Sequence, residues 1–155
     1  MEQVKREIGL ALSSKQEAAV YAAYRHNLSI ITGSPGTGKT TVLKTILEVY
    51  RRLHPQGEIA LMAPTGRASR RMAESTGVDK AKTLHSILGL ASEEDEIKRN
   101  NTQEPLSADL IIVDEFSMVD MWLANKFFSR IKGGARVILV GDPDQLPSVG
   151  AGNVF

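Results

Sequence analysis

Four short apolar runs rich in β-branched residues divide the chain. They cover residues 28–32, 59–63, 110–114 and 136–140. Their hydrophobicity is continuous rather than alternating, which is typical of strands buried on both faces of a parallel sheet. The pattern therefore predicts four buried strands.

Segments with the 3.6-residue period of a helix lie between these runs. The first covers residues 40–53, and its apolar stripe consists of Leu43, Ile46, Leu47 and Tyr50. A second stripe follows Ser117 and Asp120, a pair that can cap a helix. Its members are Val119, Trp122, Leu123, Phe127 and Ile131. Alternating strands and helices predict an α/β fold, mainly a parallel sheet with helices on both faces, whose ligands bind at the carboxyl ends of the strands.

Composition narrows the class of protein. The chain has 155 residues, of which 42% are hydrophobic and 24% charged, with a net charge of +1 and no cysteine. This length allows one domain, and the composition excludes disordered and fibrous classes. The lack of cysteine excludes a disulfide framework, a thiolate nucleophile and a cysteine-bound zinc. Because no apolar run reaches the roughly 18 residues of a membrane span, we expect a cytoplasmic protein with no membrane partner.

The segment 89–108 interrupts the alternation. It is polar and carries five acidic residues against two basic ones. The sequence predicts a small insertion here, and a hairpin, a lid and a solvated surface loop all remain open.

Residues 33–40 read GSPGTGKT and match the phosphate-loop pattern G-x-x-x-x-G-K-[ST] in full. The match lies directly between a predicted strand and a predicted helix, where backbone N–H groups and the helix N-terminus bind phosphate. Lys39 would contact the β- and γ-phosphates, and the Thr40 hydroxyl would ligate Mg²⁺. The alternative is a glycine-rich turn with an incidental lysine. We predict a site for ATP and Mg²⁺ whose nucleotide-binding residues include Gly33, Ser34, Pro35, Gly36, Thr37, Gly38, Lys39, Thr40 and Thr41.

Asp114 and Glu115 end the third apolar run. Adjacent side chains at a strand end diverge, so the two carboxylates can do different work. Asp114 suits Mg²⁺ binding through its water shell, and Glu115 suits orienting or deprotonating the attacking water. The alternative is an exposed acidic turn at the start of the next helix, where carboxylates favour the helix dipole.

A second polar loop, residues 141–147, follows the fourth run. Gln145 can hydrogen-bond the γ-phosphate or the attacking water, which would let the loop distinguish ATP from ADP. A turn punctuated by prolines explains the same residues, and spacing alone favours the turn.

Five ordered segments together resemble the motif set of superfamily 1 DNA helicases, in the RecD-like group that includes the alpha subunit of exodeoxyribonuclease V and TraA-type helicases. They are GSPGTGKT, APTGRAS at 63–69, KTLHSILG at 82–89, VDEFSMVD at 113–120 and VGDPDQLPSVG at 140–150. The resemblance covers residues 9–155 and leaves 1–8 as the tail of a preceding region or a native start. It implies the first RecA-like motor domain, C-terminally truncated, of an ATP-dependent helicase of DNA recombination or repair that moves 5′ to 3′.

The resemblance also implies roles for single residues. Gln16 matches an adenine-reading glutamine, although Ser13 and Gln16 also fit a capping box. Thr40 and Asp114 match the metal ligands. The implied catalytic residues are Lys39, Asp114, Glu115 as the base and Gln145 as the γ-phosphate sensor.

Contacts with single-stranded DNA are implied at Pro64, Thr65, Arg67, Thr83 and His85. Residues 67–82 carry five basic residues against two acidic ones, which suits phosphates. A solvated helix face explains the same charges, and His85 can simply make a local hydrogen bond. The segment 89–108 stands where the family inserts its strand-separating pin, but its acidity is unexpected for an element that touches DNA.

The resemblance implies three kinds of partner: single-stranded DNA, a second RecA-like domain of the same parent chain, and RecB/RecC-like subunits. Because the arginines that complete the γ-phosphate site belong to later motifs, this chain alone should hydrolyse ATP poorly. Three alternatives stay open, namely an AAA+ ATPase, a nucleotide-switched binding module and a small-molecule kinase. The loop at 140–145 in place of a polar sensor disfavours the first, the intact site residues disfavour the second, and a Glu115 base that activates water disfavours the third.

Overall fold

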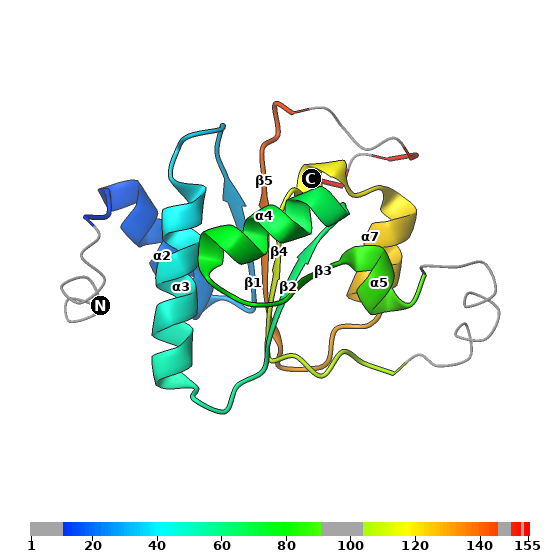
Figure 1. Cartoon of the computed structure of the whole chain (residues 1–155), viewed down its shortest axis with the longest axis horizontal. Helices are drawn as coiled ribbons and strands as arrows, with labels where there is room; N and C mark the ends of the chain where they lie inside the picture. The colour runs from blue at the N-terminus through cyan, green and yellow to red at the C-terminus, as the bar shows by residue number, and fades with distance from the viewer. Residues whose placement is uncertain (1–10, 91–103, 146–149, 153) are drawn as a thin grey trace.

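The computed structural model describes residues 11–90, 104–145, 150–152 and 154–155 (Figure 1). Its strands are β1 (Leu28–Thr32), β2 (Ile59–Ala63), β3 (Ala81–Thr83), β4 (Leu110–Val113) and β5 (Arg136–Gly141). Its helices are α2 (Ser14–Arg25), α3 (Lys39–Leu53), α4 (Gly66–Thr76), α5 (Leu84–Leu88), the 3₁₀ helix η1 (Phe116–Met118) and α7 (Met121–Phe128). The four predicted strands and the helix after the phosphate loop are confirmed.

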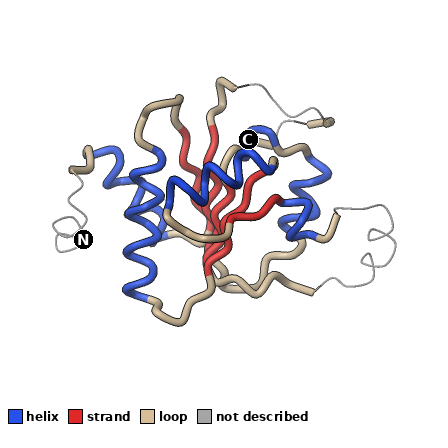
Figure 2. Tube along the Cα trace, in the orientation of Figure 1, coloured by secondary structure: helices blue, strands red, loops and turns tan. Residues whose placement is uncertain are grey.

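The five strands form one parallel sheet in the order β1-β5-β4-β2-β3. Figure 2 shows the strands gathered in the centre of the molecule with helices around them. The predicted α/β fold with a parallel sheet is thus confirmed. Crossover connections put β4 and β5 between the strand that precedes the phosphate loop and β2.

Two apolar cores cover the two faces of the sheet. Helices α2, α3 and α4 pack on one face, and α5, η1 and α7 pack on the other. Strand β4 serves both cores, because Leu110 and Ile112 face the first while Ile111 and Val113 face the second. All four side chains are fully buried. The continuous apolar run of β4 follows from this burial on both faces.

Strand β1 departs from the prediction of burial on both faces. Its burial alternates, and Leu28 and Ile30 are 50% and 59% exposed. Ser29 and Ile31 point to the covered side and are buried. The reason is the position of β1 at one end of the strand order, where its outer face lacks a packed helix among the described residues.

The second predicted helix is shorter than its apolar pattern suggested. It begins after Asp120, whose carboxylate accepts the Leu123 N–H at 2.8 Å, so Asp120 rather than Ser117 caps it. Ser117 lies one turn earlier in η1. The helix ends at Phe128, which leaves Ile131 outside it, and Trp122 is 47% exposed. The expectation that Trp122 belongs to the buried stripe is wrong. Strand β3 was not predicted, because three residues are too few to show a pattern.

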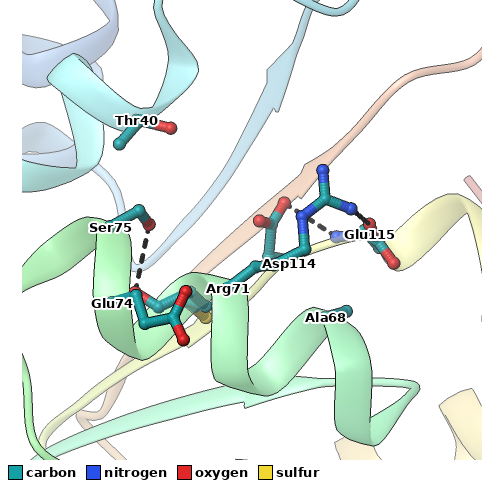
Figure 3. A pocket seen from close by; sticks show the side chains of 8 residues that line it. Thr40, Ala68, Arg71, Glu74, Ser75, Asp114 and Glu115 are labelled. Carbon is teal, nitrogen blue, oxygen red and sulfur yellow. Dashed lines mark hydrogen bonds and ion pairs between the residues drawn. The ribbon is translucent and has the colours of Figure 1, made fainter.

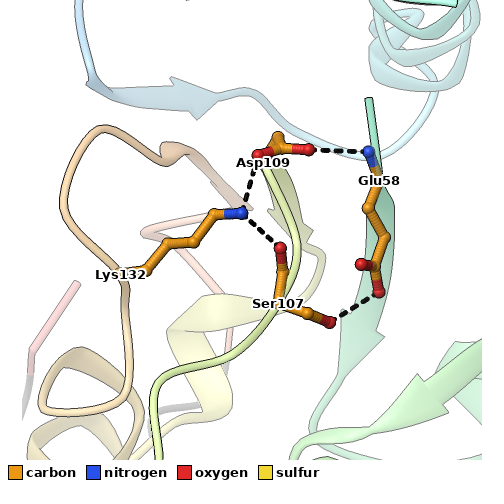
Figure 4. A network of polar contacts seen from close by, with 4 residues as sticks. All are labelled: Glu58, Ser107, Asp109 and Lys132. Atoms are coloured by element: carbon orange, nitrogen blue, oxygen red, sulfur yellow. Dashed lines mark hydrogen bonds and ion pairs between the residues drawn. The ribbon is translucent and has the colours of Figure 1, made fainter. Parts of the chain in front are cut away.

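A polar network ties the amino-terminal ends of β2 and β4 together (Figure 4). Asp109 accepts hydrogen bonds from the Glu58 N–H at 2.9 Å and from the Lys132 ammonium at 2.7 Å. Ser107 donates its hydroxyl proton to Glu58 at 2.7 Å and accepts from Lys132 at its carbonyl. The Lys132 hydrogen bond, followed by the Glu58 N–H, lowers the pKa of Asp109. Most of the predicted insertion, residues 91–103, lies outside the described residues.

Candidate functional site

The predicted site residues all gather at one edge of the sheet. The phosphate loop follows β1, the DNA-contact candidates follow β2 and β3, Asp114 and Glu115 follow β4, and the Gln145 loop follows β5. Because every strand is parallel, these five carboxyl ends meet at the same edge. The folded chain thus brings together motifs that lie more than 100 residues apart in sequence.

The phosphate loop connects β1 to α3 and is tied to its neighbour β5. The Gly33 N–H donates to the Gly141 carbonyl at 3.3 Å, and the Thr37 hydroxyl donates to the Ser34 carbonyl at 2.8 Å. The Lys39 ammonium lies against the loop and donates to the carbonyls of Gly33 and, at 3.1 Å, of Ser34. The positive charge of Lys39 is therefore held against the phosphate loop.

Gly38 closes the loop in a backbone conformation that favours glycine. It is the N-cap of α3 with φ +82°, and a Cβ there would lie 2.3 Å from Nε2 of Gln16. No side chain caps the N-terminus of α3, and no acidic residue occupies its first turn. The first N–H groups of α3 and its dipole are therefore suited to an anion at this end.

Gln16 takes part in a capping box and also contacts the phosphate loop. The capping box with Ser13 is present, since the Ser13 N–H donates to Gln16 Oε1 at 2.9 Å and the Gln16 N–H donates to Ser13 Oγ at 3.3 Å. The Gln16 side-chain amide also donates to the Thr37 carbonyl at 3.3 Å. Beside this contact lies a cavity of about 270 Å³, lined in part by Gln16, Ala19, Thr37 and Lys39. The adenine-reading role of Gln16 stays a prediction.

Asp114, Glu115 and Thr40 line a second cavity, whose volume is about 470 Å³ (Figure 3). Burial raises the pKa of Asp114, while the Glu115 N–H, which donates to its Oδ1 at 2.8 Å, and the cations Lys39 and Arg71 act against that rise. No group of three or more His, Cys, Asp or Glu side chains in the described residues is arranged to hold a metal ion. The Thr40 hydroxyl and the Asp114 carboxylate are together a sufficient set of protein ligands for Mg²⁺. This ion usually takes one or two protein oxygens together with substrate phosphates.

Glu115 has an unusual backbone. Its φ is +52°, and among the described non-glycine residues it alone has a positive φ. Non-glycine residues adopt this region at a cost of about 1–3 kcal/mol, typically where the surrounding structure fixes a functional side chain. Figure 3 shows that the Asp114 and Glu115 side chains point in different directions.

Sequence reasoning missed the role of Arg71. It counted this residue only as one charge of a basic strip, whereas the Arg71 guanidinium lies 3.8 Å from Glu115 Oε1. The pairing requires α4, which follows β2, to pass close to the end of β4. Only the strand order, in which β2 pairs with β4, reveals that proximity.

The loop that carries Gln145 forms a turn, as its spacing suggested. The Asp142 carboxylate is buried and accepts the Asp144 N–H at 3.0 Å, and the Gln145 N–H donates to the Asp142 carbonyl at 3.2 Å. The Gln145 side chain is exposed at the site edge. Its part as a γ-phosphate sensor stays a prediction.

The candidate DNA contacts lie where β2 and β3 end. Ala63 of β2 pairs with Thr83 of β3, which places Pro64 and Thr65 beside Thr83. Both threonines are helix N-caps, since Thr65 accepts the Ala68 N–H at 3.2 Å and Thr83 accepts the Ser86 N–H at 3.1 Å. As each hydroxyl accepts in its cap, its own proton can still be donated to a phosphate oxygen. The side chains of Arg67 and His85 are exposed.

The parallel sheet and phosphate loop define a nucleotide-binding domain of the phosphate-loop class, with a RecA-like fold. A family model described as an AAA domain matches residues 16–151, and the chain belongs to this family. It is 41% identical over 149 residues to the ATP-dependent RecD2 DNA helicase of Deinococcus radiodurans, covering 96% of this chain and 20% of that protein. It is 39% identical to the RecBCD enzyme subunit RecD of Haemophilus influenzae, covering 90% and 25%.

Solved helicases have the same fold. The Pif1 helicase of Candida albicans shares 29% identity with a TM-score of 0.66, covering 91% of this chain and 34% of that one. Bacteroides Pif1 bound to single-stranded DNA shares 25% identity with a TM-score of 0.62, covering 92% and 34%. The resemblance to RecD-like helicases is thus confirmed. The chain spans about a fifth to a quarter of these two curated relatives. No helix in the described residues is long and apolar enough to cross a membrane.

Proposed function

We propose that residues 9–155 form the first RecA-like motor domain of a longer ATP-dependent DNA helicase. The observation that carries the proposal is the convergence of three features at one sheet edge. These are the phosphate loop with Lys39, the carboxylates of Asp114 and Glu115, and the face formed where β2 and β3 end. A motor must place nucleotide and nucleic acid on elements that can move together, and this edge offers both surfaces.

The site residues divide the work of hydrolysis. Backbone N–H groups of residues 33–41 and the Lys39 ammonium bind the phosphates, and Gln16 contacts adenine. The Thr40 hydroxyl and the Asp114 carboxylate would hold Mg²⁺, which would supply charge stabilisation for phosphoryl transfer. Glu115 accepts the proton of the attacking water, and Gln145 hydrogen-bonds the γ-phosphate. The unusual backbone at Glu115 supports its role as the base, because it separates this carboxylate from that of Asp114.

Single-stranded DNA binds, in this proposal, across Pro64, Thr65, Arg67, Thr83 and His85. The pairing of Ala63 with Thr83, which brings the carboxyl ends of β2 and β3 together, supports a single contact surface. Hydroxyl and guanidinium donors on that face suit a phosphate backbone without reading base sequence. The similar Bacteroides Pif1 was solved with single-stranded DNA.

The proposal extends to parts of the parent protein outside this chain. A second RecA-like domain would close over the nucleotide and supply the arginines that complete the γ-phosphate site. We further propose that the parent moves 5′ to 3′ and acts in recombination or repair in the cytoplasm with RecB/RecC-like partners. The Haemophilus influenzae relative is itself named as a RecBCD subunit.

The test is ATP hydrolysis with and without single-stranded oligo(dT), measured for this chain and for the longer helicase. We expect DNA-stimulated turnover in the longer protein and slow turnover in this chain, since the arginine contacts that we propose for the second domain are worth about a thousandfold or more. Glu115→Gln should lower turnover of the longer protein by roughly a hundredfold or more. Glu74→Gln, which changes another carboxylate of the same cavity, should not. A rate indifferent to DNA would instead favour an AAA+ ATPase or a nucleotide-switched binding module.

A further inference from the structure

The Arg71–Glu115 ion pair links two parts of the molecule that the proposed function uses separately. Arg71 lies in the middle of α4, and its guanidinium is 3.8 Å from Glu115 Oε1. Of the ion pairs between described residues, this one alone reaches the proposed active site. The side chain of Arg71 is 69% exposed and that of Glu115 28% exposed. The pair is therefore accessible and easily broken.

The pair also fixes which way Glu115 faces. Figure 3 shows the Glu115 carboxylate beside the Arg71 guanidinium, on the side away from Thr40. The Glu115 N–H is bound to Asp114 Oδ1, and the left-handed backbone turns the Glu115 side chain out of the strand direction. The carboxylate lines the same cavity as Thr40 and Asp114, but it is held on the α4 side of that cavity, away from the corner at Thr40 where the γ-phosphate and its metal are proposed to bind.

Helix α4 connects this ion pair to the candidate DNA face. Its N-cap is Thr65, and Arg67 is exposed on its first turn. Ala68, Ser69, Met72 and Thr76 are its buried residues, so one narrow stripe anchors α4 to the sheet. A helix of 11 residues moves as a rigid unit. A shift at its N-terminus is therefore transmitted to Arg71, less than two turns away.

We propose that Arg71 is a positioning residue that restrains Glu115 in the DNA-free protein and releases it when single-stranded DNA engages the N-terminus of α4. The proposal rests on the proposed function, in which Glu115 is the base and this face binds DNA. An exposed ion pair biases an equilibrium only weakly, by roughly two- to fivefold. Such a weak restraint suits a coupling device, because modest binding at the other end of α4 can overcome it.

The test compares Arg71→Ala with Arg51→Ala, an exposed arginine in the last turn of α3, in the longer helicase. Steady-state ATP hydrolysis is measured with and without oligo(dT). Arg71→Ala should raise the DNA-free kcat roughly two- to fivefold, leave the DNA-saturated kcat and the KM for ATP within about twofold, and so reduce DNA stimulation. Arg71→Lys, which keeps the charge, should restore part of the restraint. Arg51→Ala should behave like the wild type.

Three results would overturn the proposal. An unchanged DNA-free rate in Arg71→Ala shows that no restraint exists. A fall in DNA-saturated kcat shows that the pair positions Glu115 productively, and a large rise in the KM for ATP shows that Arg71 binds the nucleotide itself. Thermal unfolding midpoints verify that each variant folds. Glu115→Gln distinguishes the failure of the restraint from the failure of the proposed function. Turnover near the wild-type rate in Glu115→Gln refutes the base assignment, whereas strongly reduced turnover in Glu115→Gln beside an unchanged Arg71→Ala refutes only the restraint.

Discussion

Gly38 and Glu115 both lie at the site with a positive φ, but substitution has opposite consequences at the two positions. At Gly38 the conformation needs no side chain, and Gln16 fills the space where a Cβ would lie. At Glu115 the side chain is the proposed base, and a role of this kind would account for the conformational cost. Both positions are set by contacts with residues distant in sequence, which a local pattern does not contain.

Gly38→Ala should destabilise the domain more than Gly36→Ala. Both glycines have a φ near +80°, so alanine costs about 1–2 kcal/mol at either position. At Gly38 the new methyl group must also displace the Gln16 amide, whereas nothing lies within 4 Å at Gly36. Urea unfolding measures the difference, with Gly66→Ala as a control in a helix without positive φ. Equal losses at positions 36 and 38 would contradict the observed contact.

The elements of the fold could be predicted to different degrees. The apolar runs of β2, β4 and β5 and the apolar stripe of α3 could be recognised from the sequence, because their burial depends on local pattern and length. The exposed outer face of β1, the short strand β3 and the early end of α7 could not be predicted, since strand order and neighbouring packing decide them. The same limit applies to the site. Its motif residues could be named from sequence, whereas the Arg71 contact required knowing that β2 lies beside β4.

Asp109→Asn should weaken the joint between β2 and β4 in a pH-dependent way. Because hydrogen bonding lowers the pKa of Asp109 below its ordinary value of 3.8, the charged carboxylate stabilises the folded state above that pH. This stabilisation is lost as the pH falls through the lowered pKa. Urea unfolding at pH 7 should therefore show a less stable variant, with the difference shrinking below pH 3.8. Asp79→Asn, at an exposed position, is the control. A difference that grows in acid would contradict this assignment.

At the scale of the whole molecule, the two edges of the sheet have separate tasks. The amino-terminal edge carries the Asp109 network, which fastens strands and lies away from the loops of the site. The carboxyl edge carries the phosphate loop, the two carboxylates and the face beside β3. Substitutions at the first edge should therefore change stability, and substitutions at the second should change binding and turnover.

The most direct test of this account is equilibrium binding of a fluorescent ATP analogue to this chain, with and without Mg²⁺. The account predicts saturable binding that strengthens with Mg²⁺ and weakens at least about tenfold, or about 1.4 kcal/mol, in Lys39→Ala. Lys44→Ala, an exposed lysine on the same helix, should bind like the wild type. Equal affinity of Lys39→Ala and the wild type, or binding indifferent to Mg²⁺, would contradict a metal–nucleotide site at the phosphate loop.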